Sequence, residues 1–381
     1  MKCFPNITVC FLSIFLFSVP GILFSQYPSE DRNIDPEESN ILYPDQHVPA
    51  QNESHDEHPV QEEEFIPQEY IMRHIKDSHE WHIITTKEGK HVSFPLPIIL
   101  ISKHSGFHAF LSSKLAHGHT FKGFKYGEGE YSGKIVEVDE RGELAEAGLP
   151  LDFSLTKNAF MMMLSVIILL SIFLSLARSY KKSGIREPRG LQGFFEPLIV
   201  FIEEDVAIPN IGEGKHARYM PYLLTVFFFI LTNNLMGLIP FFPFGANVTG
   251  NIAVTFVLAV FTFLITQFSG NRGYWQHIFN TPGVPFWLLP IMIPLEIIGI
   301  FVKPFALMIR LFANITAGHI IVLSLISMIF IFKSVFVAFP SMLMVIFMDC
   351  IELLVAFLQA YIFTLLSALF IGLAMPEHHH D

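Results

Sequence analysis

Long runs of uncharged, apolar residues fill the second half of the chain. Residues 159–177 are 19 consecutive positions without Asp, Glu, Lys or Arg, enough for one helix to cross a bilayer. Residues 219–271 are uncharged but too long for one span, and prolines and glycines between 240 and 250 indicate a hairpin of two. Residues 285–375 are apolar with embedded charges, and Pro340 is expected to split them into two long helices. The pattern predicts an all-α multi-pass membrane protein with about five membrane helices.

Between the first and second spans, the sequence predicts an amphipathic helix on the membrane surface, within 193–208. The surrounding loop, 178–218, carries Arg178, Lys181, Lys182, Arg186, Arg189, Lys215 and Arg218. Lys and Arg concentrate in cytoplasmic loops, so this loop is predicted to be cytoplasmic. The part before the first span is then periplasmic, the C-terminus is cytoplasmic, and the chain lies in the bacterial inner membrane.

The first 155 residues differ in composition from the rest. Residues 1–25 have the charge and apolar run of a signal peptide. A first transmembrane helix is the alternative, which we disfavour because Pro20 and Gly21 interrupt the run. Residues 26–64 are rich in Asp and Glu and are predicted to be a disordered acidic linker. Residues 65–155 form a small periplasmic module, followed by the membrane domain at 156–376 and a short tail at 377–381.

The periplasmic module is rich in histidine, with eleven of the chain's 17 histidines between positions 47 and 119. Segments 91–113 and 133–148 resemble short strands with turns, so the module is expected to contain β structure. Metal binding is one interpretation, supported by His117 and His119. Solvent-facing histidines are the interpretation we favour, because no predicted helix places a His and a carboxylate at ligand spacing.

Composition narrows the function further. Hydrophobic residues make up 51% of the 381 positions and charged residues only 15%, so part of the chain must face lipid. A net charge of −11 disfavours nucleic acid as a partner. The three cysteines, Cys3, Cys10 and Cys350, have no metal-ligand spacing, and no metal site or cofactor is predicted.

Ionisable groups inside the apolar segments are costly and indicate function. Glu296, Lys303 and Arg310 are each seven residues apart, so they share one face if the helix continues through Pro304. Asn314 follows on nearly the same face. His319 is nine residues from Arg310 and is expected to point the opposite way.

The last helix carries Asp349, Glu352 and Gln359. If the two long helices form an antiparallel hairpin that turns between 333 and 340, Arg310 is expected to meet Gln359. His319 is expected to meet Glu352 at another depth. Arg keeps its charge and cannot relay protons, whereas a coupled His–Glu pair can load and release them near neutral pH.

These residues occur in motifs that resemble subunit a of F-type ATP synthases. The motifs are IRLFANITAGH at 309–319, LQAY at 358–361 and NNLMGLIPF at 233–241. The resemblance implies a membrane subunit that is not itself an enzyme and couples proton flow to rotation of a c-ring. It implies partners in the c subunits, b-type stalk subunits and the rest of the F1F0 complex.

The resemblance also implies roles for individual residues. Arg310 would be the essential arginine opposite the c-subunit carboxylate, with Asn314 and Gln359 near it. A proton would enter along Asn234, His319 and Glu352 and leave along Glu296, with Lys303 and Asp349 in support. The chain departs from many bacterial relatives in exchanging His and Glu at 319 and 352, and in having Gly237 where some have Asp.

Two other functions remain open from the residues. An independent secondary transporter would need internal repeats or broken helices around a substrate site, and no repeat is evident. A metal-sensing membrane protein would use the exported histidines.

Overall fold

The computed structural model describes most of the chain from residue 77 onward. The described ranges are 77–85, 91–115, 118–127, 133–139, 149–183, 190–239, 243–280 and 284–375, with single residues at 13, 67, 71, 131 and 144. Apart from residue 13, the predicted signal peptide, the acidic linker and the C-terminal tail lie outside the described residues.

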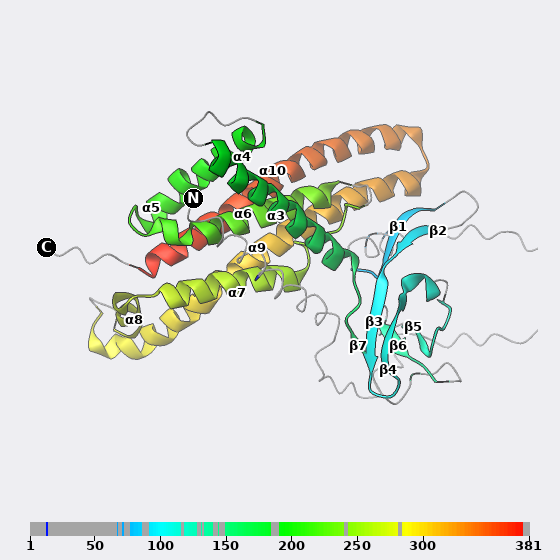
Figure 1. The fold of residues 1–381 in the computed structure, drawn as a ribbon, viewed down its shortest axis with the longest axis horizontal. Helices are drawn as coiled ribbons and strands as arrows, with labels where there is room; N and C mark the ends of the chain where they lie inside the picture. The colour runs from blue at the N-terminus through cyan, green and yellow to red at the C-terminus, as the bar shows by residue number, and fades with distance from the viewer. Residues whose placement is uncertain are drawn as a thin grey trace, which may run out of the picture.

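Five helices in the described ranges are long and apolar enough to cross a membrane, which confirms the predicted number of spans. They are α3 (Lys157–Ser183), α6 (His216–Leu238), α7 (Ile252–Ser269), α9 (Leu289–Phe332, preceded by the short η6, Phe286–Leu288) and α10 (Val335–Leu373). Figure 1 shows them lying along one another as an elongated bundle.

Helix α6 is the centre of the bundle. In an apolar window of 18 residues, 72% of the α6 positions are buried, whereas only 6% are in the corresponding window of Phe286–Phe332. Three consecutive side chains on α6, Phe227, Phe228 and Phe229, are fully buried and belong to a core that extends into α3, α9 and α10. The long helices therefore lie at the periphery, with large apolar side chains left on their outer surface.

The two long helices form an antiparallel hairpin, but they do not divide at Pro340. Lys333 adopts a left-handed backbone conformation that ends α9, and Ser334 is extended before α10 begins at Val335. Pro340 lies inside α10, near its first turns, where the missing N–H affects few helical hydrogen bonds. The expectation that Pro340 splits the segment was wrong. At 44 residues α9 is about 66 Å long, over twice the ~30 Å hydrocarbon core, so it can lie in a bilayer only if strongly tilted.

The shorter helices after α3 lie toward the end of the bundle that is opposite the turn between α9 and α10 (Figure 1). They are α4 (Leu191–Phe201), the π-helical turn η5 (Ile202–Ala207), α5 (Ile208–Ile211) and α8 (Arg272–Phe279). Residues 191–211, which include the segment 193–208 predicted as a helix, are thus helical. Here the Asn271 N–H donates to the Ala374 carbonyl at 3.0 Å, so the end of α7 and the end of α10 lie on one side.

The module before α3 is a small β structure, as the segment patterns predicted. Strands β3 (Pro97–Ser102), β4 (Gly106–Leu111) and β7 (Leu151–Asp152) form one antiparallel sheet. Strand pairs β1 (Glu80–Thr85) with β2 (His91–Pro95), and β5 (Phe124–Tyr126) with β6 (Ile135–Glu137), complete it. Its apolar core consists of Ile98, Leu100, Leu115, Phe124 and Ile135.

The β module is attached directly to the start of α3. The Lys157 N–H donates to the Ser78 carbonyl at 2.9 Å, and the Asn158 N–H donates to Asp77 Oδ1 at 3.1 Å. The Trp81 ring packs edge-on against Phe160 with centroids 5.8 Å apart. The junction therefore holds the module against the bundle (Figure 1).

A buried His79–Asp152 pair links β7 to the segment before β1, with 3.1 Å between Nε2 and Oδ2. Burial alone would raise the pKa of Asp152, but hydrogen bonds from His79 and Ser154 outweigh it and lower that pKa. A lowered native pKa stabilises the fold above the unfolded-state pKa, and this stabilisation is lost as the pH falls through the native value.

We therefore expect Asp152→Asn to destabilise the module at pH 7 by about 1–3 kcal/mol, the usual range for a charged hydrogen bond. Amide hydrogen exchange of β3 in the full chain in detergent measures the change. The difference from the unaltered chain should begin to shrink below about pH 4, the ordinary pKa of an aspartate, and continue to shrink as the pH falls through the lower native pKa. The exposed Asp139→Asn should have no such effect, and equal β3 protection in all three chains at pH 7 would contradict the prediction.

Candidate functional site

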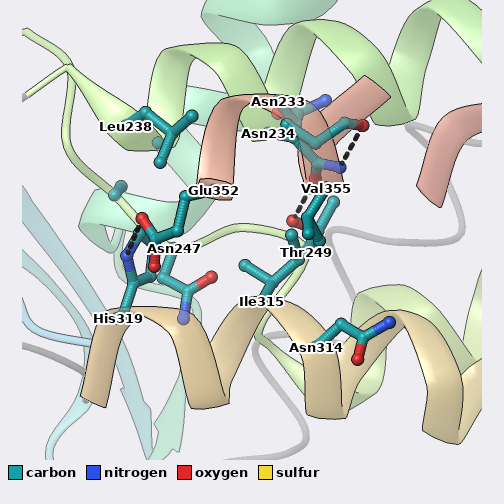
Figure 2. Close-up of a pocket in the computed structure, with 13 residues that line it drawn as sticks. Asn233, Asn234, Leu238, Asn247, Thr249, Asn314, Ile315, His319, Glu352 and Val355 are labelled. Carbon is teal, nitrogen blue, oxygen red and sulfur yellow. Dashed lines mark hydrogen bonds and ion pairs between the residues drawn. The ribbon is translucent and has the colours of Figure 1, made fainter. Parts of the chain in front are cut away.

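The cavity where the predicted site residues gather lies between α6, α9, α10 and the 243–251 loop. It encloses about 330 Å³ including its mouth. Figure 2 shows side chains from these elements converging on it. Its lining consists of Asn233, Asn234, Gly237, Leu238, Ala246, Asn247, Thr249, Asn314, Ile315, His319, Glu352, Val355 and Ala356.

His319 on α9 faces Glu352 on α10 across this cavity. His319 Nδ1 and Glu352 Oε2 are 3.8 Å apart, and the two side chains are 20% and 11% exposed. Figure 2 shows the two groups pointing toward each other. The predicted contact between these residues is confirmed. Gly318 makes it possible, because a Cβ there would overlap the Glu352 carboxylate.

Asn234 holds the cavity wall together. Its Nδ2 donates to the Ala356 carbonyl on α10 at 3.1 Å, and its Oδ1 accepts a hydrogen bond from Thr249 at 2.6 Å. One side chain thus joins α6, α10 and the 243–251 loop. Both amide atoms of Asn234 are engaged, so the residue is held rigidly at the cavity.

Several polar atoms around the cavity are buried without a protein partner among the described residues. They are Asn233 Oδ1, Asn247 Nδ2 and Glu352 Oε1, and all three residues line the cavity. Buried polar atoms in native proteins are nearly always paired with protein or with ordered water. A cavity with three such atoms and a titratable pair suits bound water.

A second cavity, of about 340 Å³, lies at the other end of the long helices. Its lining consists of Thr262, Phe263, Thr266, Gln267, Tyr274, Ile300, Lys303, Pro304, Phe370 and Leu373. Pro304 has no N–H to donate to the Ile300 carbonyl one turn earlier, so a backbone acceptor is freed beside the cavity. Lys303 Nζ is 5.8 Å from the Phe370 ring centroid.

Arg310 lies between the two cavities along α9. It is six residues after Pro304, about 9 Å, and four before Asn314, about 6 Å. Its side chain is exposed on the outer face of α9, and it forms no ion pair or hydrogen bond within the described part of the chain. On α10, Gln359 likewise lies between the residues that line the first cavity and those that line the second. Its side chain is buried, with 5% of its surface exposed. No hydrogen bond joins Arg310 to Gln359, so that predicted contact is not confirmed.

Other predicted residues lie outside the cavities. Glu296 is half-buried on α9 one turn before Ile300, and Asp349 is exposed on α10 one turn before Glu352. Neither lines a cavity. Conversely, Asn247 and Thr249 were missed because their loop was interpreted only as an uncharged turn.

No group of three or more His, Cys, Asp or Glu suited to a metal ion occurs within the ranges that the structure describes. His117, half of the pair that suggested metal binding, lies outside them.

In a comparison with known proteins, two family models match the chain. The model of the ATP synthase A chain matches residues 159–372, and that of a domain of unknown function, DUF8433, matches residues 70–153. The chain is 55% identical over 238 residues to ATP synthase subunit a 2 of Chlorobaculum tepidum, covering 60% of this chain and 66% of that protein.

Other relatives align over a similar region. ATP synthase subunit a of Chloroherpeton thalassium is 49% identical over 60% of this chain and 69% of its own length. Subunit a of an Anaeromyxobacter species, strain Fw109-5, is 45% identical over 65% of this chain and 62% of its own length. The chain thus spans about two thirds of the length of the curated relatives it matches.

The proximity of His319 to Glu352 predicts a specific crosslink. In a chain whose native cysteines are replaced by serine, His319→Cys with Glu352→Cys should be joined by a short bifunctional thiol reagent. Arg310→Cys with Glu352→Cys should not, because nine residues of helix, about 13 Å, separate 310 from 319. Mobility on denaturing gels after proteolysis between α9 and α10 measures the product. Equal yields from both pairs would contradict the arrangement.

Proposed function

We propose that this chain, which belongs to the ATP synthase A chain family, is the proton-translocating subunit a of an F-type ATP synthase. The family model covers more than half of the chain, and every span of the bundle lies within the match or overlaps it. Within the enzyme the subunit catalyses no covalent chemistry. It couples proton flow across the membrane to rotation of a c-ring.

The observation that carries this proposal is the pair of cavities on either side of Arg310. One cavity borders the loop between α6 and α7, and the other borders the opposite end of α7 and α8. They share the two long helices but no lining residue. Two water-accessible half-channels that do not meet are what a rotary proton path needs, because a continuous channel would dissipate the gradient.

The first cavity supports a role in proton entry. A proton arriving by water would be held by the His319–Glu352 pair, whose groups accept and release protons without a large movement. Asn234 would fix the wall and the water positions rather than carry the proton, since an amide does not titrate near neutral pH. The proton would then pass to a c-subunit carboxylate on the outer face of the two long helices.

Arg310 supports the separation of the two half-channels. Its guanidinium keeps its charge in proteins, so it cannot pass a proton from one cavity to the other. An unpaired cation on an apolar face is costly unless it meets a partner of opposite charge. A c-subunit carboxylate that has lost its proton would supply that partner and would be released when the next proton arrives.

The second cavity supports a role in proton exit toward the cytoplasm. Lys303 lines it, and Glu296 lies one turn beyond Ile300 in the same direction. Asn314 lines the first cavity on the side nearer Arg310, and Gln359 lies on α10 between the residues that line the two cavities. Both side chains would line the approach to Arg310. Asp349, exposed one turn from Glu352, would add negative charge near the entry path.

The outer face of the long helices supports contact with the c-ring. Exposed apolar side chains run along both helices, including Phe301, Phe305, Leu353 and Leu354. Arg310 lies among them. We assign the b-type stalk and the remaining subunits as further partners because the family functions within the F1F0 complex. The β module would lie in the periplasm and the C-terminus in the cytoplasm, as the Lys and Arg distribution predicts.

Neither alternative gains support. The relatives and the family model point to ATP synthase rather than to an independent transporter. For a metal sensor, the described histidines offer no three-residue ligand group.

Replacing the fixed cation tests the proposal. Arg310→Ala should reduce ATP-driven proton pumping by inverted vesicles to background, because nothing then holds the deprotonated carboxylate at the boundary. Quenching of a pH-sensitive dye measures pumping, and immunoblotting measures assembly. Ile298→Ala, which shortens another exposed side chain on α9, should pump normally. Pumping by assembled Arg310→Ala at the unaltered rate would refute the assignment.

A further inference from the structure

The junction between the β module and α3 buries a group of titratable side chains that the mechanism above does not use. Asp77, His79, Asp152 and Lys157 belong to it, with Tyr126 and Glu80 beside them. His79, Asp152 and Lys157 are each at most 9% exposed. Charged groups are rarely buried together unless they pair or serve a function.

These side chains interact electrostatically, one with the next. His79 pairs with Asp152 at 3.1 Å and also interacts with the Asp77 carboxylate. Asp77 interacts with the Lys157 ammonium. Lys157 in turn lies within electrostatic range of His319, the histidine of the entry cavity. The series therefore leads from the β module to the site already described.

Structural roles account for only part of this arrangement. Asp77 Oδ1 accepts hydrogen bonds from the Ser78 and Asn158 N–H groups, and so caps the start of α3. Its second oxygen, Oδ2, is buried without a hydrogen-bond partner among the described residues, as is Asn158 Oδ1. Asn158 is 2% exposed. A hydrogen bond from the Thr156 side chain also reaches the Asp77 carboxylate. Buried acceptors that remain without a protein partner indicate ordered water at this junction.

We propose that the junction is the outer segment of the proton entry path, with Asp77 and His79 exchanging protons with periplasmic water ahead of His319. The inference rests on the proposed function and extends it to a module whose family has no assigned role. A proton from water binds the Asp77 carboxylate or the His79 imidazole. It leaves that group through water for the His319–Glu352 pair, and the donor returns to its starting state. Lys157 is a positioning residue that holds the Asp77 carboxylate between module and bundle.

The electrostatics of Asp77 fit this role. Burial raises the pKa of Asp77, and the Thr156 hydrogen bond, Lys157, the Asn158 N–H and His79 oppose that rise without cancelling it. The same burial raises the pKa of Tyr126, with Glu80 and Asp152 adding to the effect, so this phenol stays protonated and does not compete. A carboxyl with a raised pKa can release and regain a proton closer to neutral pH than an exposed one.

Two substitutions distinguish a role in proton exchange from a purely structural role at the junction. Asp77→Asn keeps a good helix cap, since Asn and Asp cap equally well, but cannot titrate. His79→Gln keeps a hydrogen-bonding group opposite Asp152 but cannot be protonated. His104→Gln and Asp139→Asn, both exposed in the same module, are the matched controls.

The test measures passive proton conductance of the whole membrane sector in liposomes while only the pH on the module side is varied. We expect Asp77→Asn and His79→Gln each to lower conductance about tenfold, the effect of one pKa unit, and to remove one limb of the pH profile. The controls should match the unaltered sector. Hydrogen exchange at the Asn158 amide checks that the junction is intact.

The outcomes distinguish the two proposals. If the unaltered sector conducts no protons, the proposed function fails. If it conducts and both variants keep its rate and pH profile, the junction is architectural and this inference is overturned. If a single variant loses the hydrogen-exchange protection of the Asn158 amide, the double variant Asp77→Asn with His79→Gln is measured as well. Proton conductance equal to that of the unaltered sector in this double variant also overturns the inference.

Discussion

The cost of placing a permanent charge in hydrocarbon governs this structure. Arg310 projects from the outer face of α9 among apolar side chains, without an ion pair in the described chain. Such a residue is tolerated where a partner supplies the opposite charge. Its position between two cavities suits the proposed mechanism, in which a c-subunit carboxylate must pass the arginine to move from one cavity to the other.

Close packing of α9 on α10 supports this arrangement. Gly318 lets the Glu352 carboxylate approach α9 and meet His319, and Asn234 joins α10 to α6 and the 243–251 loop. This packing fixes the His319 imidazole and the Glu352 carboxylate relative to each other. The β module adds a buried charged junction at the start of α3, on the side of the entry cavity. Polar groups are thus concentrated around the proposed entry cavity, whereas exposed apolar side chains run along the outer face of the long helices.

The sequence predicted the membrane part well and the site in part. Uncharged runs indicated five spans. In an antiparallel hairpin, residues at equal depth have residue numbers with a constant sum, and this relation predicted the contact of His319 with Glu352. Pro340 misled because a proline near the first turns of a helix is tolerated, whereas the left-handed Lys333 that ends α9 leaves no pattern in sequence. For Arg310 and Gln359 the contact stays a prediction, because matched positions in a hairpin give the depth of two residues and not which way their side chains point. The junction of Asp77 with α3 depends on contacts between residues some 80 positions apart, which periodicity does not reveal.

Sided accessibility of α9 tests the central claim most directly. Single cysteines at 300, 303, 310, 314 and 319, in the assembled complex without native cysteines, would be exposed to a membrane-impermeant thiol reagent added to one side of oriented vesicles. The account predicts that Asn314→Cys and His319→Cys react only from the side of the β module. Ile300→Cys and Lys303→Cys should react only from the other side, and Arg310→Cys from neither. A series that reacts continuously through position 310 from a single side would contradict it.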